Sequence, residues 1–210
     1  FAFSDNRFEL NYYIGSPVPV YSYIYHEYVN NFMGNQVCAM LNKVEENFTY
    51  RLAYSFTAGD MLSLVTLGDG KVEYSWDDWI APHDKTVDKQ VAYNFIRTLN
   101  CWRQGAAGRY LHEGRMVRPV AVTCGKQHFT LDDGSAYTPD EVLTTAYTSG
   151  GRTLQFVVNY NRHEVTVNLS RAVGGYTDSN LTAEFAPTDK LTLAPLSVVA
   201  LKLDDSAKKL

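Results

Sequence analysis

The sequence has little cysteine, no excess of positive charge and no long apolar run, and each shortage excludes a class of protein. Its three cysteines are odd in number and widely spaced, which argues against a disulfide framework and against a zinc site. The formal net charge of -4 is not that of a typical nucleic-acid-binding domain. No run of about 18 apolar residues occurs, so we expect no membrane-spanning helix.

The common cofactor and nucleophile motifs are also missing. There is no G-x-G-x-x-G segment, no phosphate-binding P-loop and no G-x-S-x-G elbow. His-Glu pairs begin at His26 and His112, but neither is followed by the second histidine of the H-E-x-x-H zinc helix. We therefore expect neither a metal ion nor an organic cofactor.

Residues 1–118 alternate between helical and strand-like patterns. Apolar residues three and four apart predict helices over 35–58 and 86–104, and Gly59 and Gly105 follow them as stop signals. A run rich in valine, isoleucine and tyrosine predicts a strand over 18–25, and the apolar run 62–67 predicts a second strand. The first run is apolar at nearly every position, so both of its faces should be covered, which is typical of a parallel α/β sheet.

Residues 119–205 change to a period of two and predict an antiparallel β-sandwich. The turns are expected at 149–151 and at 161–162, and residues 206–210 form a polar tail. The predicted strands cover 142–147, 153–160, 163–170, 181–185 and 198–203.

Residues 1–118 are too few to close a complete (β/α)8 barrel, which takes roughly 250 residues. They form either a small α/β layer or the C-terminal end of a larger barrel. The chain begins with Phe1 rather than methionine, so we expect that a leader has been removed or that this is a piece of a longer protein.

The strongest candidate site is the run Tyr25, His26, Glu27 and Tyr28, at the end of the first predicted strand. Ligands of parallel α/β sheets bind at the carboxyl ends of the strands. Glu27 could act there as a general acid or base with His26 as a neighbouring donor, and the tyrosines could stack on sugar rings. The alternative is a solvated glutamate beside tyrosines that only pack.

Two weaker candidates lie further along the chain. The run Trp76, Asp77, Asp78 and Trp79 sets two carboxylates between two indole rings and could hold a sugar, or it could be a surface loop anchored by its tryptophans. Asp60 follows the helix-ending Gly59 and fits a turn or cap aspartate better than a catalytic one.

Several segments resemble a glycoside-hydrolase-like TIM-barrel family known as the domain of unknown function DUF6259. The stretch 18–28 looks like its late barrel strand, 56–63 like the next helix-to-strand junction, and 110–119 like the exit from the barrel. Segments 157–160 and 193–199 are similar to the C-terminal β-sandwich that caps many glycosidases.

The resemblance implies a partial (β/α)8-type barrel, its last βα units, followed by an antiparallel β-sandwich. It also implies that an N-terminal barrel segment of the same protein is missing here, and with it one of the two catalytic carboxylates. Only Glu27 and His26 are carried over from the resemblance as catalytic residues. The predicted substrate contacts, Tyr25, Tyr28, Trp76, Asp77, Asp78 and Trp79, rest on the residues themselves.

The expected function is hydrolysis of O-glycosidic bonds in an oligo- or polysaccharide by the complete protein. The alternatives are a non-catalytic carbohydrate-binding or structural module, and a scaffold that binds no ligand. The expected partners are a carbohydrate and the missing barrel segment, without nucleic acid or membrane.

Overall fold

The computed structural model describes residues 20–29, 45–61, 65–66, 72–73, 89–130 and 136–203. The helices in these ranges are α1 (Val20–Tyr25), α2 (Glu45–Ala58), α3 (Lys89–Gln104) and α4 (Gly108–Glu113). The short strands are β1 (Val65–Thr66), β2 (Val72–Glu73), β3 (Arg115–Val117), β4 (Val122–Thr123), β5 (Phe129–Thr130) and β6 (Ala136–Tyr137). The long strands are β7 (Val142–Ser149), β8 (Arg152–Asn159), β9 (Val165–Tyr176), β10 (Glu184–Leu193) and β11 (Ser197–Leu203).

The main sheet is antiparallel, as the second half of the sequence predicts. Its strand order is β10-β9-β11-β8-β7-β3, and β4 pairs with β9. Strands β7 and β8 form a hairpin in which Ser149 pairs with Arg152. Gly150 and Gly151 between them have φ angles of 58° and 79°, the positive values that a two-residue type I′ turn requires. The hairpin predicted at 149–151 is therefore confirmed.

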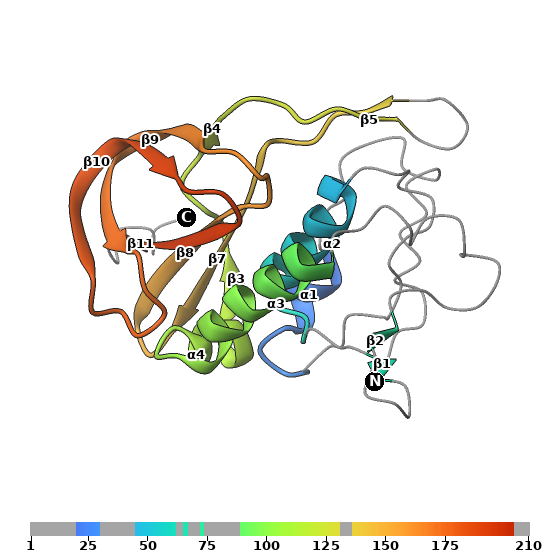
Figure 1. Cartoon of the computed structure of the whole chain (residues 1–210). Helices are drawn as coiled ribbons and strands as arrows, with labels where there is room; N and C mark the ends of the chain where they lie inside the picture. Colours follow the sequence, from blue (N-terminus) through green and yellow to red (C-terminus); the bar gives the residue numbers. More distant parts are fainter. Residues whose placement is uncertain are drawn as a thin grey trace.

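The sheet curls over so that β9, β10 and β4 face β7, β8 and β11 (Figure 1). Strand β9 makes the fold-over possible, because one part of it pairs with β4 while its end pairs with β11. An aliphatic core fills the space between the two layers and includes Val157 of β8, Leu201 of β11 and Val167 of β9. This enclosed core is what the alternating pattern of the second half predicts.

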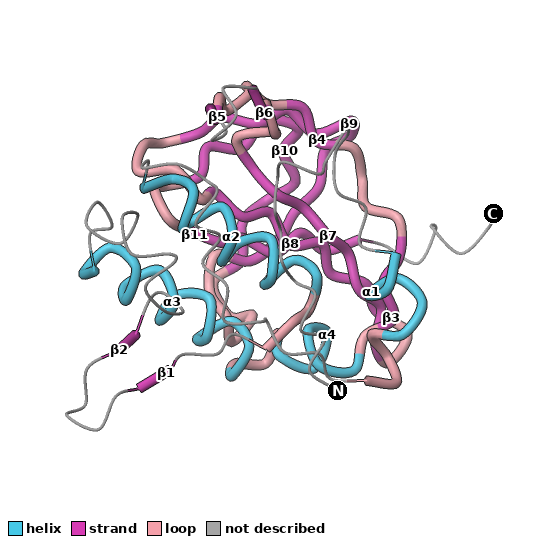
Figure 2. Tube along the Cα trace, turned by 90° about the vertical axis from the view of Figure 1, so that its right-hand side faces the viewer, coloured by secondary structure: helices cyan, strands magenta, loops and turns pink. Residues whose placement is uncertain are grey.

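Helices α2, α3 and α4 cover the other face of β7, β8 and β11, and α2 and α3 lie side by side over the strands (Figure 2). Phe156 of β8 is fully buried there, with the rings of Phe56 and Trp102 edge-on to it at centroid distances of 5.9 and 6.0 Å. Side chains of β8 thus alternate between the helix layer and the aliphatic core. With both faces covered, every residue from Leu154 to Asn159 is buried.

Helix α2 ends as the sequence predicts. Gly59 has a φ of 82°, and its amide donates to the Phe56 carbonyl at 3.0 Å. The Asp60 amide donates to the Ser55 carbonyl at 2.9 Å, which completes a Schellman motif. The described part of the helix predicted over 35–58 is confirmed, as is the helix predicted over 86–104, which the structure shows from Lys89 to Gln104.

The strand predicted over 18–25 is wrong, because its described part is helix α1. Ser22 and His26, one helical turn apart, are buried, whereas Tyr23, Ile24 and Tyr25 are exposed. A high content of β-branched and aromatic residues favours a strand, but this preference depends on what the side chains pack against. Here the segment packs through Ser22 and His26, which lie on one side of a helix.

The parallel pairing expected of the strand predicted over 62–67 is also wrong for its described part. Val65–Thr66 is β1, which pairs antiparallel with β2, Val65 lying opposite Glu73. All strand pairs in the described ranges are antiparallel, so the partial barrel stays a prediction. The division of the chain at residue 118 also stays a prediction, although the core under α2 and α3 includes side chains from both sides of it.

Two further details differ from the prediction. The corner at 161–162 does not join paired strands, because β11 lies between β8 and β9. The strand predicted over 181–185 runs instead from Glu184 to Leu193. The turn before it contains Leu181 at a φ of 60°, and the Asp178 carboxylate accepts the amides of Thr182 and Ala183 there.

Candidate functional site

Helix α1 and the turn after it present an exposed aromatic surface, which we call the tyrosine surface. It consists of Tyr23, Tyr25 and Tyr28, whose exposed fractions are 61%, 47% and 75%, together with Val20 and Ile24. Glu27 is exposed within the same turn. The structure thus places Tyr25, Glu27 and Tyr28 on the surface together.

His26 points the other way and anchors α1 to the body of the molecule. Its side chain is only 7% exposed. Nδ1 lies 2.6 Å from the Gly114 carbonyl oxygen and Nε2 lies 3.1 Å from that of Leu111. The ring packs against Tyr147 of β7. His26 therefore holds the helix to the corner between α4 and β3.

The charge state of His26 is set by two opposing effects. Its two ring nitrogens both face carbonyl oxygens, and only an imidazolium can donate to both. Burial has the larger influence and lowers the pKa of His26 below its ordinary value, while the Gly114 and Leu111 carbonyls act to raise it. A neutral ring donates to one carbonyl, and the shorter distance favours Nδ1–H donating to Gly114.

Gly59 makes room for this histidine. A Cβ built at Gly59 would overlap Nε2 and Cδ2 of the His26 ring. The residue that ends α2 is thus also the residue that lets α1 approach. The end of the helix and the contact with His26 both require a residue without a Cβ at this position.

Arg103 and His112 extend this polar cluster behind α1. The Arg103 guanidinium donates to the Gly59 carbonyl at 3.2 Å, and its other amino group lies 3.4 Å from His112 Nδ1. His112 Nε2 lies 2.9 Å from the Arg103 carbonyl, so the ring joins both the side chain and the backbone of Arg103. These contacts join α2, α3 and α4.

Asp60 belongs to the same buried cluster. Its charge acts on Arg103 to raise the pKa, although burial, the larger influence, lowers the pKa of Arg103. Tyr147 donates its hydroxyl to the Thr57 carbonyl at 2.7 Å. Asp60 thus sits in a structural network at the end of α2, where its amide also caps the helix.

The strand that should have carried Glu27 to a barrel mouth is helical, so the positional argument for a catalytic Glu27 no longer holds. Its exposure beside tyrosines remains. The second predicted group, Trp76, Asp77, Asp78 and Trp79, lies outside the described residues. Catalytic and binding roles for all these residues stay predictions.

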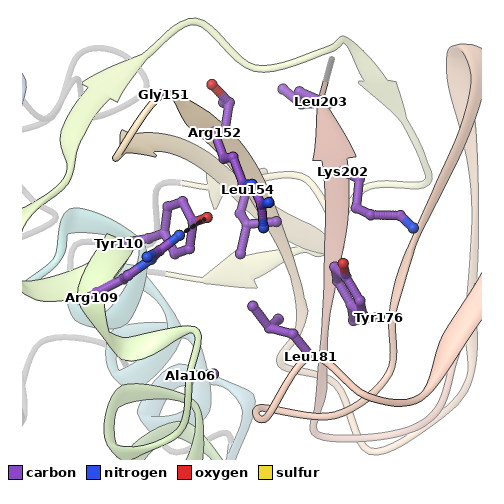
Figure 3. A pocket seen from close by; sticks show the side chains of 11 residues that line it. Ala106, Arg109, Tyr110, Gly151, Arg152, Leu154, Tyr176, Leu181, Lys202 and Leu203 are labelled. Atoms are coloured by element: carbon purple, nitrogen blue, oxygen red, sulfur yellow. Dashed lines mark hydrogen bonds between the residues drawn. The ribbon is translucent and has the colours of Figure 1, made fainter. Parts of the chain in front are cut away.

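Sequence reasoning did not identify a cavity of about 690 Å³ on the opposite side of α4. It lies between the start of α4, the β7–β8 turn and the end of β11 (Figure 3). Arg109, Arg152, Tyr176 and Lys202 line it. No motif links these residues; the only local signal is the Gly150-Gly151 turn, which places Arg152 at the cavity.

Two negative findings apply to the described residues alone. No group of three histidine, cysteine, aspartate or glutamate side chains there is placed to hold a metal ion. None of the helices there has the length and apolarity needed to cross a bilayer.

No family model matches the sequence, and no curated protein matches it. Solved structures that resemble the fold include Gan42B, a GH42 β-galactosidase from G. stearothermophilus, with a TM-score of 0.27, 16% identity and 42% of this chain covered. A GH30 endoxylanase from Clostridium papyrosolvens C71 has a TM-score of 0.32, 17% identity and 83% covered. The maltogenic α-amylase AmyB from Thermotoga neapolitana has a TM-score of 0.32, 14% identity and 80% covered.

The chain spans 10%, 42% and 36% of the length of these three structures. All three are glycoside-acting enzymes by name. At TM-scores below 0.5 the likeness carries no argument about the activity of this chain, and the DUF6259 resemblance stays a prediction.

Proposed function

We propose that the protein containing this chain acts on glycosides and contacts its carbohydrate through the tyrosine surface. The observation that carries this proposal is the exposure of Tyr23, Tyr25 and Tyr28 around Glu27. Large exposed apolar groups mark interaction surfaces, and tyrosine combines a flat apolar face with a hydroxyl that can bind sugar hydroxyls.

The anchoring of α1 supports the same proposal. His26 ties the helix to the corner between α4 and β3, so the exposed rings lie on an element that is already positioned. Prior positioning lowers the entropy cost of binding. In this proposal Glu27 is the group that performs acid-base chemistry on the bound sugar.

A carbohydrate-binding role without hydrolysis is the second candidate. Glycoside hydrolysis by the usual route needs two carboxylates beside one bond. Asp60, the other candidate carboxylate from the sequence that the structure describes, is buried in the polar cluster and cannot contact a bound substrate. The tyrosine surface would then bind the sugar and leave its bonds intact.

The test compares Glu27→Gln with a matched control, Glu164→Gln, which alters an exposed glutamate before β9. Hydrolysis of a panel of activated aryl glycosides is measured for the full-length protein and both variants. Loss of a general acid typically lowers the rate about 10²–10⁴-fold, which we expect for Glu27→Gln alone. Equal rates for all three proteins would remove Glu27 from the chemistry.

Binding of unmodified oligosaccharides separates the two candidates. Tyr28→Ala should weaken binding in either case, because it removes the most exposed ring of the tyrosine surface. Binding without hydrolysis in any protein would support the binding module. Unchanged binding in Tyr23→Ala, Tyr25→Ala and Tyr28→Ala would overturn both candidates.

A further inference from the structure

The cavity beside α4 combines a basic rim with an apolar floor. Figure 3 shows Arg109 and Tyr110 of α4 along one wall and Tyr176 and Lys202 of the strands along the other. Leu154 and Leu203, both almost fully buried, contribute apolar surface. Its volume of about 690 Å³ lies in the range of small-molecule sites, which are mostly apolar with a few placed polar groups.

The charge on the strand wall is already balanced. Lys202 Nζ lies 2.6 Å from the Glu184 carboxylate and 5.0 Å from the centre of the Tyr176 ring. Because Glu184 offsets its charge, this lysine contributes mainly to the wall of the cavity and little to its net charge.

Arg109 of α4 and Arg152 of β8 have no such balance among the described residues. The Arg152 side chain is exposed and makes no hydrogen bond or ion pair with any described residue. Arg109 lies over the Tyr110 ring at 4.9 Å and donates to the Tyr110 hydroxyl at 2.9 Å, so its charge meets no carboxylate in the described ranges. Acidic side chains outnumber basic ones by 23 to 19 in the sequence, yet two guanidinium groups that pair with no carboxylate among the described residues line one cavity.

The Gly150-Gly151 turn passes beside Arg109 and leads directly into Arg152. A Cβ added at Gly150 would lie 4.0 Å from Arg109 Nη1, so the turn passes directly beside that guanidinium. Arg152 begins β8 immediately after the turn. Elements from two parts of the chain thus place two arginines at one opening.

We propose that this cavity binds an organic carboxylate of monosaccharide size, with Arg109 and Arg152 on the carboxylate and the leucines against the apolar face of the ligand. The planar guanidinium group matches a carboxylate with two parallel hydrogen bonds, which a lysine cannot supply. The proposal is independent of the glycoside-acting role, because it concerns different residues on α4, β8 and β11.

The test uses the full chain and D-glucuronate as the probe, with D-glucose as its neutral counterpart and inorganic sulfate as a small anion. Isothermal titration should show glucuronate binding, weakened by added salt, and no comparable binding of glucose or sulfate. Equal binding of glucose would remove the role of the charge. Sulfate binding as tight as that of glucuronate would show that the cavity does not select an organic ligand.

Arg152→Gln should weaken glucuronate binding about 10- to 100-fold, in line with a lost charge-assisted hydrogen bond. The matched control is Arg118→Gln, an exposed arginine between β3 and β4 that should leave the affinity unchanged. Arg109→Lys keeps the charge but loses the fork and should also weaken binding. Unchanged affinity in both Arg152→Gln and Arg109→Lys, in proteins that melt like the parent, would overturn the proposal, as would failure of the parent to bind glucuronate.

Discussion

The His26 imidazole lies against the Tyr147 ring, with the ring centroids 4.5 Å apart and the planes inclined by 35°. Tyr147 belongs to β7, the strand between β8 and the edge strand β3, so this contact joins the short helix α1 to the main sheet. The histidine that the sequence suggested for chemistry is thus part of the packing that holds the candidate surface in place.

His26→Ala should destabilise the protein by about 2–4 kcal/mol, because it leaves a cavity against Tyr147 and leaves the Gly114 carbonyl without its donor. Urea unfolding measures the change. Tyr23→Ala on the exposed side of α1 is the control and should change the free energy of unfolding by less than about 0.5 kcal/mol. Equal effects of the two substitutions would contradict the anchoring role.

The stability of the protein should fall as the pH drops below about 6.5. Burial lowers the pKa of His26 in the folded state, so between the folded and unfolded pKa values the unfolded chain binds more protons. Stability from this group is complete above the unfolded pKa of roughly 6.5 and is lost as the pH falls through the window below it.

Urea unfolding at pH 7.5, 6.5 and 5.5 measures this dependence, and His26→Gln should flatten it. Asp178 has a lowered pKa because backbone amides donate to it, and its contribution is lost only at more acidic pH, below the carboxylate's ordinary range. A dependence between pH 7.5 and 5.5 that persists unchanged in His26→Gln would assign it to another group.

Gly59→Ala should be far more damaging than Gly151→Ala. Both glycines have a φ close to 80°, so both substitutions introduce backbone strain of roughly 1 kcal/mol. A Cβ at Gly151 meets open space, whereas a Cβ at Gly59 runs into the His26 ring. Thermal melting of the two variants isolates the steric contribution, and similar melting temperatures would show that α1 can move away without cost.

Phe156→Ala should destabilise the protein by about 3–5 kcal/mol, the usual cost of removing a fully buried phenylalanine. It should also test whether the helices and the sheet unfold together, since Phe156 contacts Phe56 of α2 and Trp102 of α3. Tryptophan fluorescence and far-ultraviolet circular dichroism should report coincident transitions. Two separated transitions would indicate that residues 1–118 and 119–205 fold independently.

The parts of the fold that could be predicted are those in which the local sequence pattern and the tertiary contacts favour the same secondary structure. Helix α2 shows a three-and-four apolar repeat and a glycine stop, and its apolar side packs against one face of the sheet. Strands β7, β8, β9 and β11 follow runs of β-branched and aromatic residues between turn signals. In each case the preference of the chain and the contacts of the folded molecule agree, so the pattern predicts the element.

The candidate site could not be predicted in the same way, because the orientation of its side chains depends on contacts between distant segments. Tyr25, His26, Glu27 and Tyr28 read as a polar and aromatic cluster at a strand end. In the fold, His26 is 88 residues from Gly114 in sequence and yet bonds to it, which turns it inward and its neighbours outward. Nothing in the local sequence specifies that partner.

The sequence by itself determined the two long helices, the antiparallel strands of the second half and the glycine turns, because these depend on local periodicity and backbone freedom. Only the tertiary structure decided that residues 20–25 are helical, that His26 is an anchor, and that Arg109 and Arg152 share a cavity. The physical reason is that a side chain becomes buried only when the fold brings distant segments together. Once it is buried, its hydrogen bonds are stronger and decide which way it points.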